Sequence, residues 1–135
     1  MAKYQQIYID VYKRSIFIFL GSHKEFKLWV QDYFKDDSDY SDFARYVEDK
    51  ESNNPQGTFW YNTNIGEGVI ELKKFPKTAK EIATATHECL HAVFHILDYC
   101  GVEYNPNSSG ESHTYLLEYI VANLLNINNY KNYDT

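Results

Sequence analysis

Three histidines and a glutamate occupy successive turns of one expected helix. The segment from Thr86 to His95 reads THECLHAVFH, so His87, His91 and His95 are four residues apart and Glu88 follows the first histidine. At about 100° per residue these four side chains share one face of a helix, and apolar residues fill the remaining arc. The pattern predicts a helix that turns a polar stripe toward a site and packs its other side into a core.

His87, Glu88 and His91 form the pattern H-E-x-x-H. Two imidazoles one turn apart can bind the same zinc ion, and the carboxylate stays within reach of a metal-bound water. Zinc lowers the pKa of such a water toward neutrality, and Glu88 would accept the proton. We therefore interpret His87 and His91 as metal ligands and Glu88 as the catalytic base. The alternative is chance, because a pattern with three fixed positions recurs in unrelated proteins.

A third metal ligand is expected from the next helix. Glu111 lies twenty residues after His91, near the start of that helix, and a helix-loop-helix reversal would return its first turn to the metal. Two other interpretations stay open. Ser108 and Glu111 have the spacing of a capping box, so Glu111 could only close the helix start. Glu118 falls on the same helix face and could replace Glu111 as the ligand or orient a histidine.

The other histidines and the cysteines are expected to lie outside the metal centre. His95 should line the pocket, because one further helical turn carries it away from a tetrahedral ion. His113 is about 200° from Glu111 on the helical wheel, which we interpret as a surface position. Cys89 should point into the core. About 16 Å of helix separate it from Cys100, so the two cannot form a disulfide there.

The flanking segments predict a sheet and further helices. Alternating β-branched and aromatic residues around short reversals predict two hairpins, of residues 6–12 with 15–20 and 58–62 with 68–73. Apolar residues at helical spacing predict a helix over 24–34, for which Ser22 is available as the cap. The acidic segment 35–57 reads as a loop or insertion that contains a short helical turn.

The helix that carries the histidines has clear ends. Thr78 and Glu81 form a capping box at its start, and Gly101 supplies a left-handed stop. This predicts a helix over about 79–100, followed by a last helix from about residue 110 and a polar tail, 126–135, that frays. The expected fold class is α+β, with an antiparallel or mixed sheet packed on the active-site helix and the metal-site helix pair at about 78–125.

Composition and charge narrow the class of protein. The 135 residues are sized for one domain, 1–135, and 44% hydrophobic residues are enough for a core. No apolar run approaches the roughly eighteen residues of a membrane span, so no membrane partner is expected. A net charge of -6 opposes binding to nucleic acid. The first residues lack the pattern of a secretory signal, which favours a cytoplasmic location.

The spacing of the candidate ligands resembles that of the thermolysin-like gluzincins, in which H-E-x-x-H is followed by a ligand glutamate at the same interval. This resemblance implies a zincin fold in which His87, His91 and Glu111 bind Zn²⁺ and Glu88 is the base. It departs from the larger gluzincins at Tyr115, where they carry an acid. The run HECLHAVFHIL, followed by Glu-x-x-x-Tyr, also resembles small metallopeptidases encoded by bacteriophages and prophages.

Zincins also place a sheet over the active-site helix and pair its edge strand with an extended peptide, and residues 58–62 or 68–73 would serve here. The leading hypothesis is thus a small zinc metallopeptidase acting on a protein or peptide, in the host cytoplasm if a phage encodes it. The alternative is a non-catalytic, zinc-stabilised structural or virion-associated protein that binds a partner in a phage assembly. A metal-free helical interaction module is disfavoured, because a core helix gains nothing from imidazoles and a carboxylate on one face.

Overall fold

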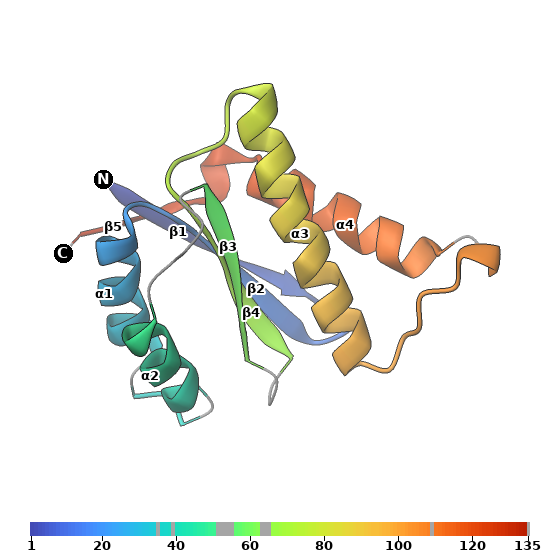
Figure 1. The fold of residues 1–135 in the computed structure, drawn as a ribbon, viewed down its shortest axis with the longest axis horizontal. Helices are drawn as coiled ribbons and strands as arrows, with labels where there is room; N and C mark the ends of the chain where they lie inside the picture. Colours follow the sequence, from blue (N-terminus) through green and yellow to red (C-terminus); the bar gives the residue numbers. More distant parts are fainter. Residues whose placement is uncertain (35, 39, 51–55, 63–65, 109, 135) are drawn as a thin grey trace.

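A five-stranded mixed sheet lies between two pairs of helices in a computed structural model of the chain (Figure 1). The structure describes residues 1–34, 36–38, 40–50, 56–62, 66–108 and 110–134. Within them the elements are β1 (Ala2–Ile9), β2 (Arg14–Leu20), α1 (His23–Phe34), α2 (Ser41–Asp49), β3 (Gly57–Asn62), β4 (Glu67–Leu72), α3 (Ala79–Tyr99), α4 (Glu111–Leu124) and β5 (Lys131–Tyr133), with 3-10 turns at Pro106–Ser108 and Ile127–Asn129. The expected α+β class is confirmed.

The two expected hairpins form and join through a parallel pairing. The strand order is β3-β4-β2-β1-β5, with β1 and β2 antiparallel, β3 and β4 antiparallel, and β2 parallel to β4. Strand β1 ends at Ile9, earlier than expected, because residues 10–13 make the reversal and Lys13 adopts a φ of 53°. The central strands β4 and β2 therefore have neighbours on both edges, and β3 is an edge strand.

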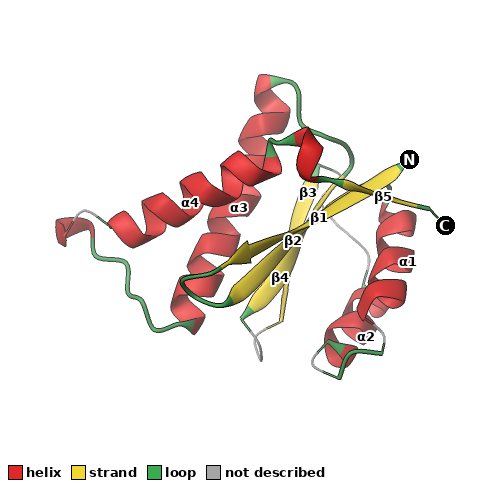
Figure 2. Cartoon of the chain, turned by 180° about the vertical axis from the view of Figure 1, so that it is seen from behind, coloured by secondary structure: helices red, strands yellow, loops and turns green. Residues whose placement is uncertain are grey.

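Both faces of the sheet are covered, as the view from behind shows (Figure 2). Successive side chains of a strand point to opposite faces. In β2 this sends Ile16, Ile18 and Leu20 toward the core beneath α3 and α4, and Phe17 and Phe19 toward the aromatic core beneath α1 and α2. Because α3 packs on a sheet that is supported from its far side, the residues on its outer face are held in fixed positions.

Residues 127–129 form a 3-10 turn and residues 131–133 a strand, so the expectation that the tail frays is wrong for this part, and residue 135 lies outside the described residues. Strand β5 pairs antiparallel with the outer edge of β1, and the Tyr130 hydroxyl donates to the Leu124 carbonyl at 2.7 Å. The open edge of β1 offers unpaired backbone groups that a short polar strand can satisfy. In the segment 35–57, the expected helical turn is confirmed as α2, and residues 51–55 lie outside the described part.

No helix in the described part of the chain has the length and apolar character needed to cross a membrane.

Helix α3 begins at the capping box that the sequence predicts. The Glu81 N–H donates to the Thr78 hydroxyl at 3.1 Å, and the Glu81 carboxylate accepts from the Thr78 N–H at 3.1 Å. The same carboxylate accepts from Lys74 Nζ at 2.9 Å. Hydrogen bonds from the Lys74 side chain and from the backbone N–H groups of Lys77 and Thr78 lower the pKa of Glu81 to about 2. At the other end, Gly101 adopts a φ of 77° and ends the helix as expected.

Thr78→Ala is expected to lower the free energy of unfolding by about 1 kcal/mol, because it removes the acceptor for an N–H group of the first turn.

The folded pKa of Glu81 lies below its ordinary value of 4.5. The contribution of this carboxylate to the free energy of unfolding is therefore complete above pH 4.5 and is lost as the pH falls toward 2. Urea unfolding at pH 7 and pH 3 should show a smaller acid-induced loss for Glu81→Gln than for wild type. An equal loss would contradict this, and the exposed Lys80→Ala serves as the control.

Candidate metal centre

His87 and His91 lie side by side on the exposed face of α3. Their Nε2 atoms are 3.2 Å apart, and their ring centroids are 4.8 Å apart with planes at 79°. Two nitrogens that each lie about 2.0–2.1 Å from one tetrahedral zinc ion are separated by about 3.3 Å. The separation of the two Nε2 atoms therefore fits a shared zinc ion. Without an ion, the same distance suits a hydrogen bond between the two rings.

Glu88 follows His87 in the chain but is turned toward the sheet. It is 5% exposed, while both histidines are exposed. Burial raises the pKa of its carboxyl group, against the opposing effects of His91, His87 and the Phe59 backbone N–H. A Cβ atom on Gly57 would stand 3.6 Å from Glu88 Cγ, so the bare backbone at the start of β3 lies directly against this side chain. Glu88, the candidate base, is thus shielded from solvent, while the two imidazoles beside it are exposed.

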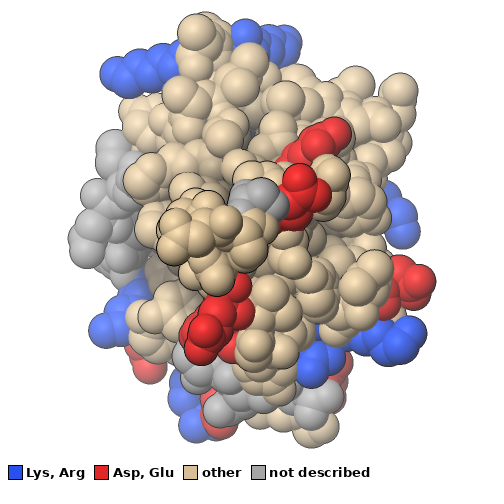
Figure 3. Space-filling model, turned by 90° about the vertical axis from the view of Figure 1, so that its right-hand side faces the viewer, with Lys and Arg blue, Asp and Glu red and all other residues tan. Residues whose placement is uncertain are grey.

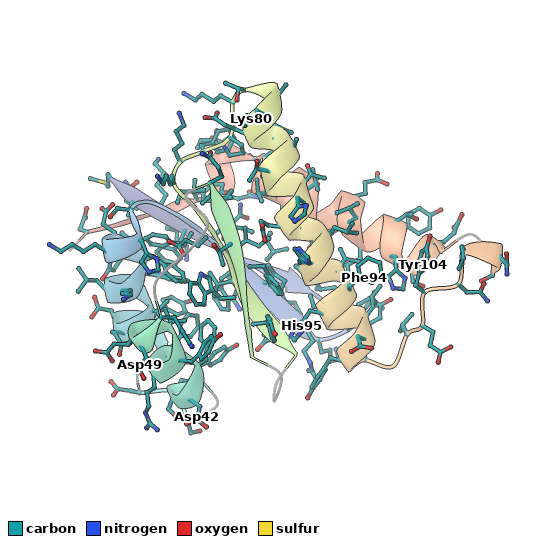
Figure 4. All side chains as sticks on the ribbon, in the orientation of Figure 1. Asp42, Asp49, Lys80, Phe94, His95 and Tyr104 are labelled. Carbon is teal, nitrogen blue, oxygen red and sulfur yellow. The ribbon has the colours of Figure 1, made fainter. Side chains whose placement is uncertain are left out.

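The edge strand β3 runs beside this part of α3. Of the two segments that could pair with a substrate, residues 58–62 are in β3 at the edge, whereas 68–72 are in β4, between β3 and β2. Figure 4 shows His95 on the side of α3 that faces this strand. Its ring centroid is 5.7 Å from that of Phe59 and 5.1 Å from that of Tyr61. His95 therefore lies between the helix and the edge strand.

Glu111 is placed away from the histidine pair. It is exposed at the start of α4 and lines a cavity with Tyr115, Tyr119 and the turn between β1 and β2. Among the described residues no group of three or more His, Cys, Asp or Glu side chains is close enough to hold a metal ion. The structure thus brings His87 and His91 together and does not bring Glu111 to them.

The capping interpretation of Glu111 is wrong. Residue Gly110 is the N-cap of α4 with a φ of 60°, and no side chain of the described residues caps the helix there. The Ser108 hydroxyl instead donates to the Asn105 carbonyl at 3.3 Å. Glu118 is also exposed, on the same side of α4 as Glu111.

His113 is buried, contrary to the surface position expected for it. It is 5% exposed, and its ring centroid lies 5.1 Å from each of the Phe94 and Tyr104 centroids. Figure 4 shows Phe94 pointing from α3 toward Tyr104, on the side opposite His95. The sequence does carry a signal for this, because His113 shares a helix face with the buried residues Leu116, Ile120 and Leu124. Because Glu111 faces outward, the angle of about 200° between the two residues turns His113 inward.

No protein family, curated protein or solved structure matches this chain. The assignment of chemistry therefore depends on the geometry of the site.

Both cysteines are free, as expected from their separation along α3. Cys89 is fully buried, and burial raises the pKa of its thiol to about 12. The neutral thiol is a poor metal ligand and nucleophile, since the thiolate is the reactive form. Cys89 thus belongs to the core of α3, as the sequence indicates.

Three features come together on this side of α3. A pair of imidazoles is spaced for one metal ion and open to solvent, a shielded carboxylate lies on the adjoining face of the same helix, and an edge strand runs alongside. Both histidines and the carboxylate belong to two consecutive turns of α3, whose ends are fixed by a cap and a glycine. Their relative positions are therefore set by helix geometry.

Proposed function

We propose that this protein is a zinc-dependent metallopeptidase, with His87 and His91 as metal ligands and Glu88 as the general base. The observation that supports this most directly is the 3.2 Å separation of the two Nε2 atoms beside a buried carboxylate. A bound zinc ion supplies a Lewis acid that polarises a carbonyl group and lowers the pKa of water. Glu88 accepts a proton from the attacking water and returns it to the departing amine.

The surroundings of Glu88 suit a general base. Burial disfavours its charged form and raises its pKa, so the carboxylate holds an accepted proton more firmly than an exposed one would. The backbone of β3 at Gly57 and Phe59 limits the access of water to it.

The expected substrate is an extended peptide segment that adds to β3, the edge strand of the sheet. Backbone groups at a sheet edge pair with an incoming strand, and side-chain contacts then select the sequence. The exposed aromatic side chain of Tyr61 lies on β3 at this position. It favours peptides with an apolar residue near the bond that is cut.

The open character of the histidine pair favours catalysis over the structural alternative. Structural zinc sites are closed by four protein ligands, while catalytic sites leave a position for water or substrate. His87 and His91 face solvent, so a metal ion that they held would keep a position open to water or substrate. A site of this kind is suited to exchange ligands.

The proposal is tested with the wild-type protein loaded with Zn²⁺. Zinc content and affinity are measured first, followed by mass spectrometry of a broad peptide library incubated with the protein. Cleavage that a chelator stops and added zinc restores would support the peptidase. Stoichiometric zinc binding with no cleavage across the library would contradict the proposal and favour the non-catalytic zinc protein, including its virion-associated form.

A separate measurement decides the role of Glu111. Because this side chain lies in another cavity, Glu111→Ala is expected to change zinc affinity by less than about tenfold, the smallest loss typical of residues that support a metal site. The gluzincin resemblance implies a much larger loss. The matched control is Glu118→Ala, which removes the other outward-facing acid of α4. A loss well above tenfold for Glu111→Ala alone would mean that Glu111 reaches the metal when zinc is bound.

A further inference from the structure

A cavity of about 540 Å³ lies between the turn that joins β1 to β2 and the outer side of α4. Figure 2 shows these two elements next to each other. The buried side chains of Ile9 and Leu116 form an apolar floor, and Tyr12, Tyr115 and Tyr119 form the walls. The volume falls within the range of about 300–1,000 Å³ that is usual for ligand sites. The proposed metallopeptidase chemistry makes no use of this cavity.

The aromatic walls are exposed and held in place. Tyr115 is 64% exposed and Tyr119 is 45% exposed, so large ring surfaces face solvent beside the apolar floor. The Tyr119 hydroxyl donates to the Tyr8 carbonyl at 3.0 Å, which fixes this ring against β1. A preformed wall of this kind binds a flat or apolar group without the cost of ordering the side chain.

The charge of the cavity is acidic. Asp10 and Glu111 line it from opposite sides, and no Lys or Arg is among its described lining residues. The nearby Arg14 is engaged elsewhere, with its guanidinium 4.9 Å from the centroid of the Tyr99 ring. The face of the molecule beside the α3–α4 loop carries acidic side chains near its middle, and both acidic and basic side chains lie at its margins (Figure 3). An occupant of this cavity should be cationic and partly apolar.

We propose that the cavity binds an arginine side chain presented by a partner protein. A guanidinium group stacks on tyrosine rings and forms paired hydrogen bonds with carboxylates, here those of Asp10 and Glu111. Its alkyl stem would lie on the floor made by Ile9 and Leu116. A lysine fits less well, because its ammonium group is compact, strongly hydrated and unable to stack.

The test uses a fluorescein-labelled glycine–serine peptide that carries two arginines, and the same peptide with neutral citrulline in their place. Fluorescence anisotropy should show binding of the arginine peptide only, with an affinity that falls as salt is added. The double variant Asp10→Asn/Glu111→Gln should bind at least about tenfold more weakly, because two charge-assisted hydrogen bonds are lost. Glu118→Gln, which removes an exposed charge of α4 outside the cavity, should bind as wild type does.

The aromatic contribution is measured with Tyr115→Ala, which should also weaken binding of the arginine peptide. The melting temperature of each variant reports whether the fold is intact. Equal binding of the arginine and citrulline peptides, no binding by wild type, or full affinity in the double variant would each overturn the proposal. A dimer that the double variant abolishes would assign the cavity to a second copy of the chain, and this too would overturn it.

Discussion

His87→Ala and His91→Ala are each expected to abolish stoichiometric zinc binding. The two Nε2 atoms 3.2 Å apart form the chelating pair, and either substitution leaves a single exposed imidazole. Loss of a supporting residue at a metal site weakens affinity by about 10–100-fold, so loss of a direct ligand should cost at least 100-fold. Calorimetric titration and zinc content after dialysis measure the effect.

The fold should survive both substitutions. Each histidine is exposed on α3, and alanine is the residue that best favours a helix. The metal-free variants should therefore unfold at the wild-type temperature. Zinc should raise the melting temperature of the wild type alone, because a ligand that binds only the folded state stabilises it by about 2.7 kcal/mol at one hundred times its Kd.

His95→Ala is the matched control for this prediction. It removes a histidine from the next turn of the same helix, where the ring contacts Phe59 and Tyr61 and leaves the pair at 87 and 91 intact. Zinc affinity should stay close to the wild-type value. If both His87→Ala and His91→Ala retain full zinc content, the metal centre lies elsewhere or does not exist.

The sequence predicts features whose causes are local. The limits of α3 follow from the hydrogen bonds between Thr78 and Glu81 and from the left-handed Gly101, all within a few residues of the ends. The approach of His87 to His91 follows from the four-residue spacing on a helix. Each of these features was expected and each is present, because no distant part of the chain is needed to produce it.

The sequence does not predict features of the fold that depend on contacts between distant parts of the chain. The pairing of β2 with β4 joins residues about fifty positions apart, and β5 forms only because β1 offers an open edge. Nothing in the polar segment 131–133 indicates a strand by itself. The burial of Glu88 also depends on a distant contact, because it requires β3 to lie against that side of α3.

The position of Glu111 in the candidate site also depends on contacts that its spacing in the sequence does not predict. Its distance along the chain from His91 suits a ligand, but the rotation of α4 decides which side chains face α3. That rotation is set by the burial of Leu116, Ile120 and Leu124, which brings His113 inward and leaves Glu111 outside. A helical wheel centred on these apolar residues would have indicated this orientation, whereas spacing from the histidines could not.

Glu88→Gln is expected to lower kcat/KM for peptide cleavage by at least about 100-fold, with zinc content unchanged. Glutamine keeps the size of the side chain and its hydrogen-bonding capacity, but it cannot accept the proton of the attacking water, and general-base catalysis contributes about 10²–10⁴-fold. Neither metal ligand is altered. Cleavage of a library peptide is compared with zinc content for the wild type and the variant.

The stability of this variant gives an independent check on the site. Burial raises the pKa of Glu88, which means that the folded state disfavours its charged form. Removing that charge at neutral pH should leave the melting temperature unchanged or raise it slightly, because the neutral amide avoids the desolvation cost. A fall in rate with a stable, zinc-loaded protein would therefore be an effect on catalysis, and a fall in both rate and stability would not.

Glu88→Asp separates the need for a carboxylate from the need for its position. It keeps the base but withdraws it by one methylene from the place where the proton is transferred, so its rate should lie between those of the wild type and Glu88→Gln. Full cleavage by Glu88→Gln would exclude Glu88 as the base. Loss of zinc from Glu88→Gln would instead make this carboxylate a metal ligand beside His87 and His91, and it would exclude Glu88 as the base.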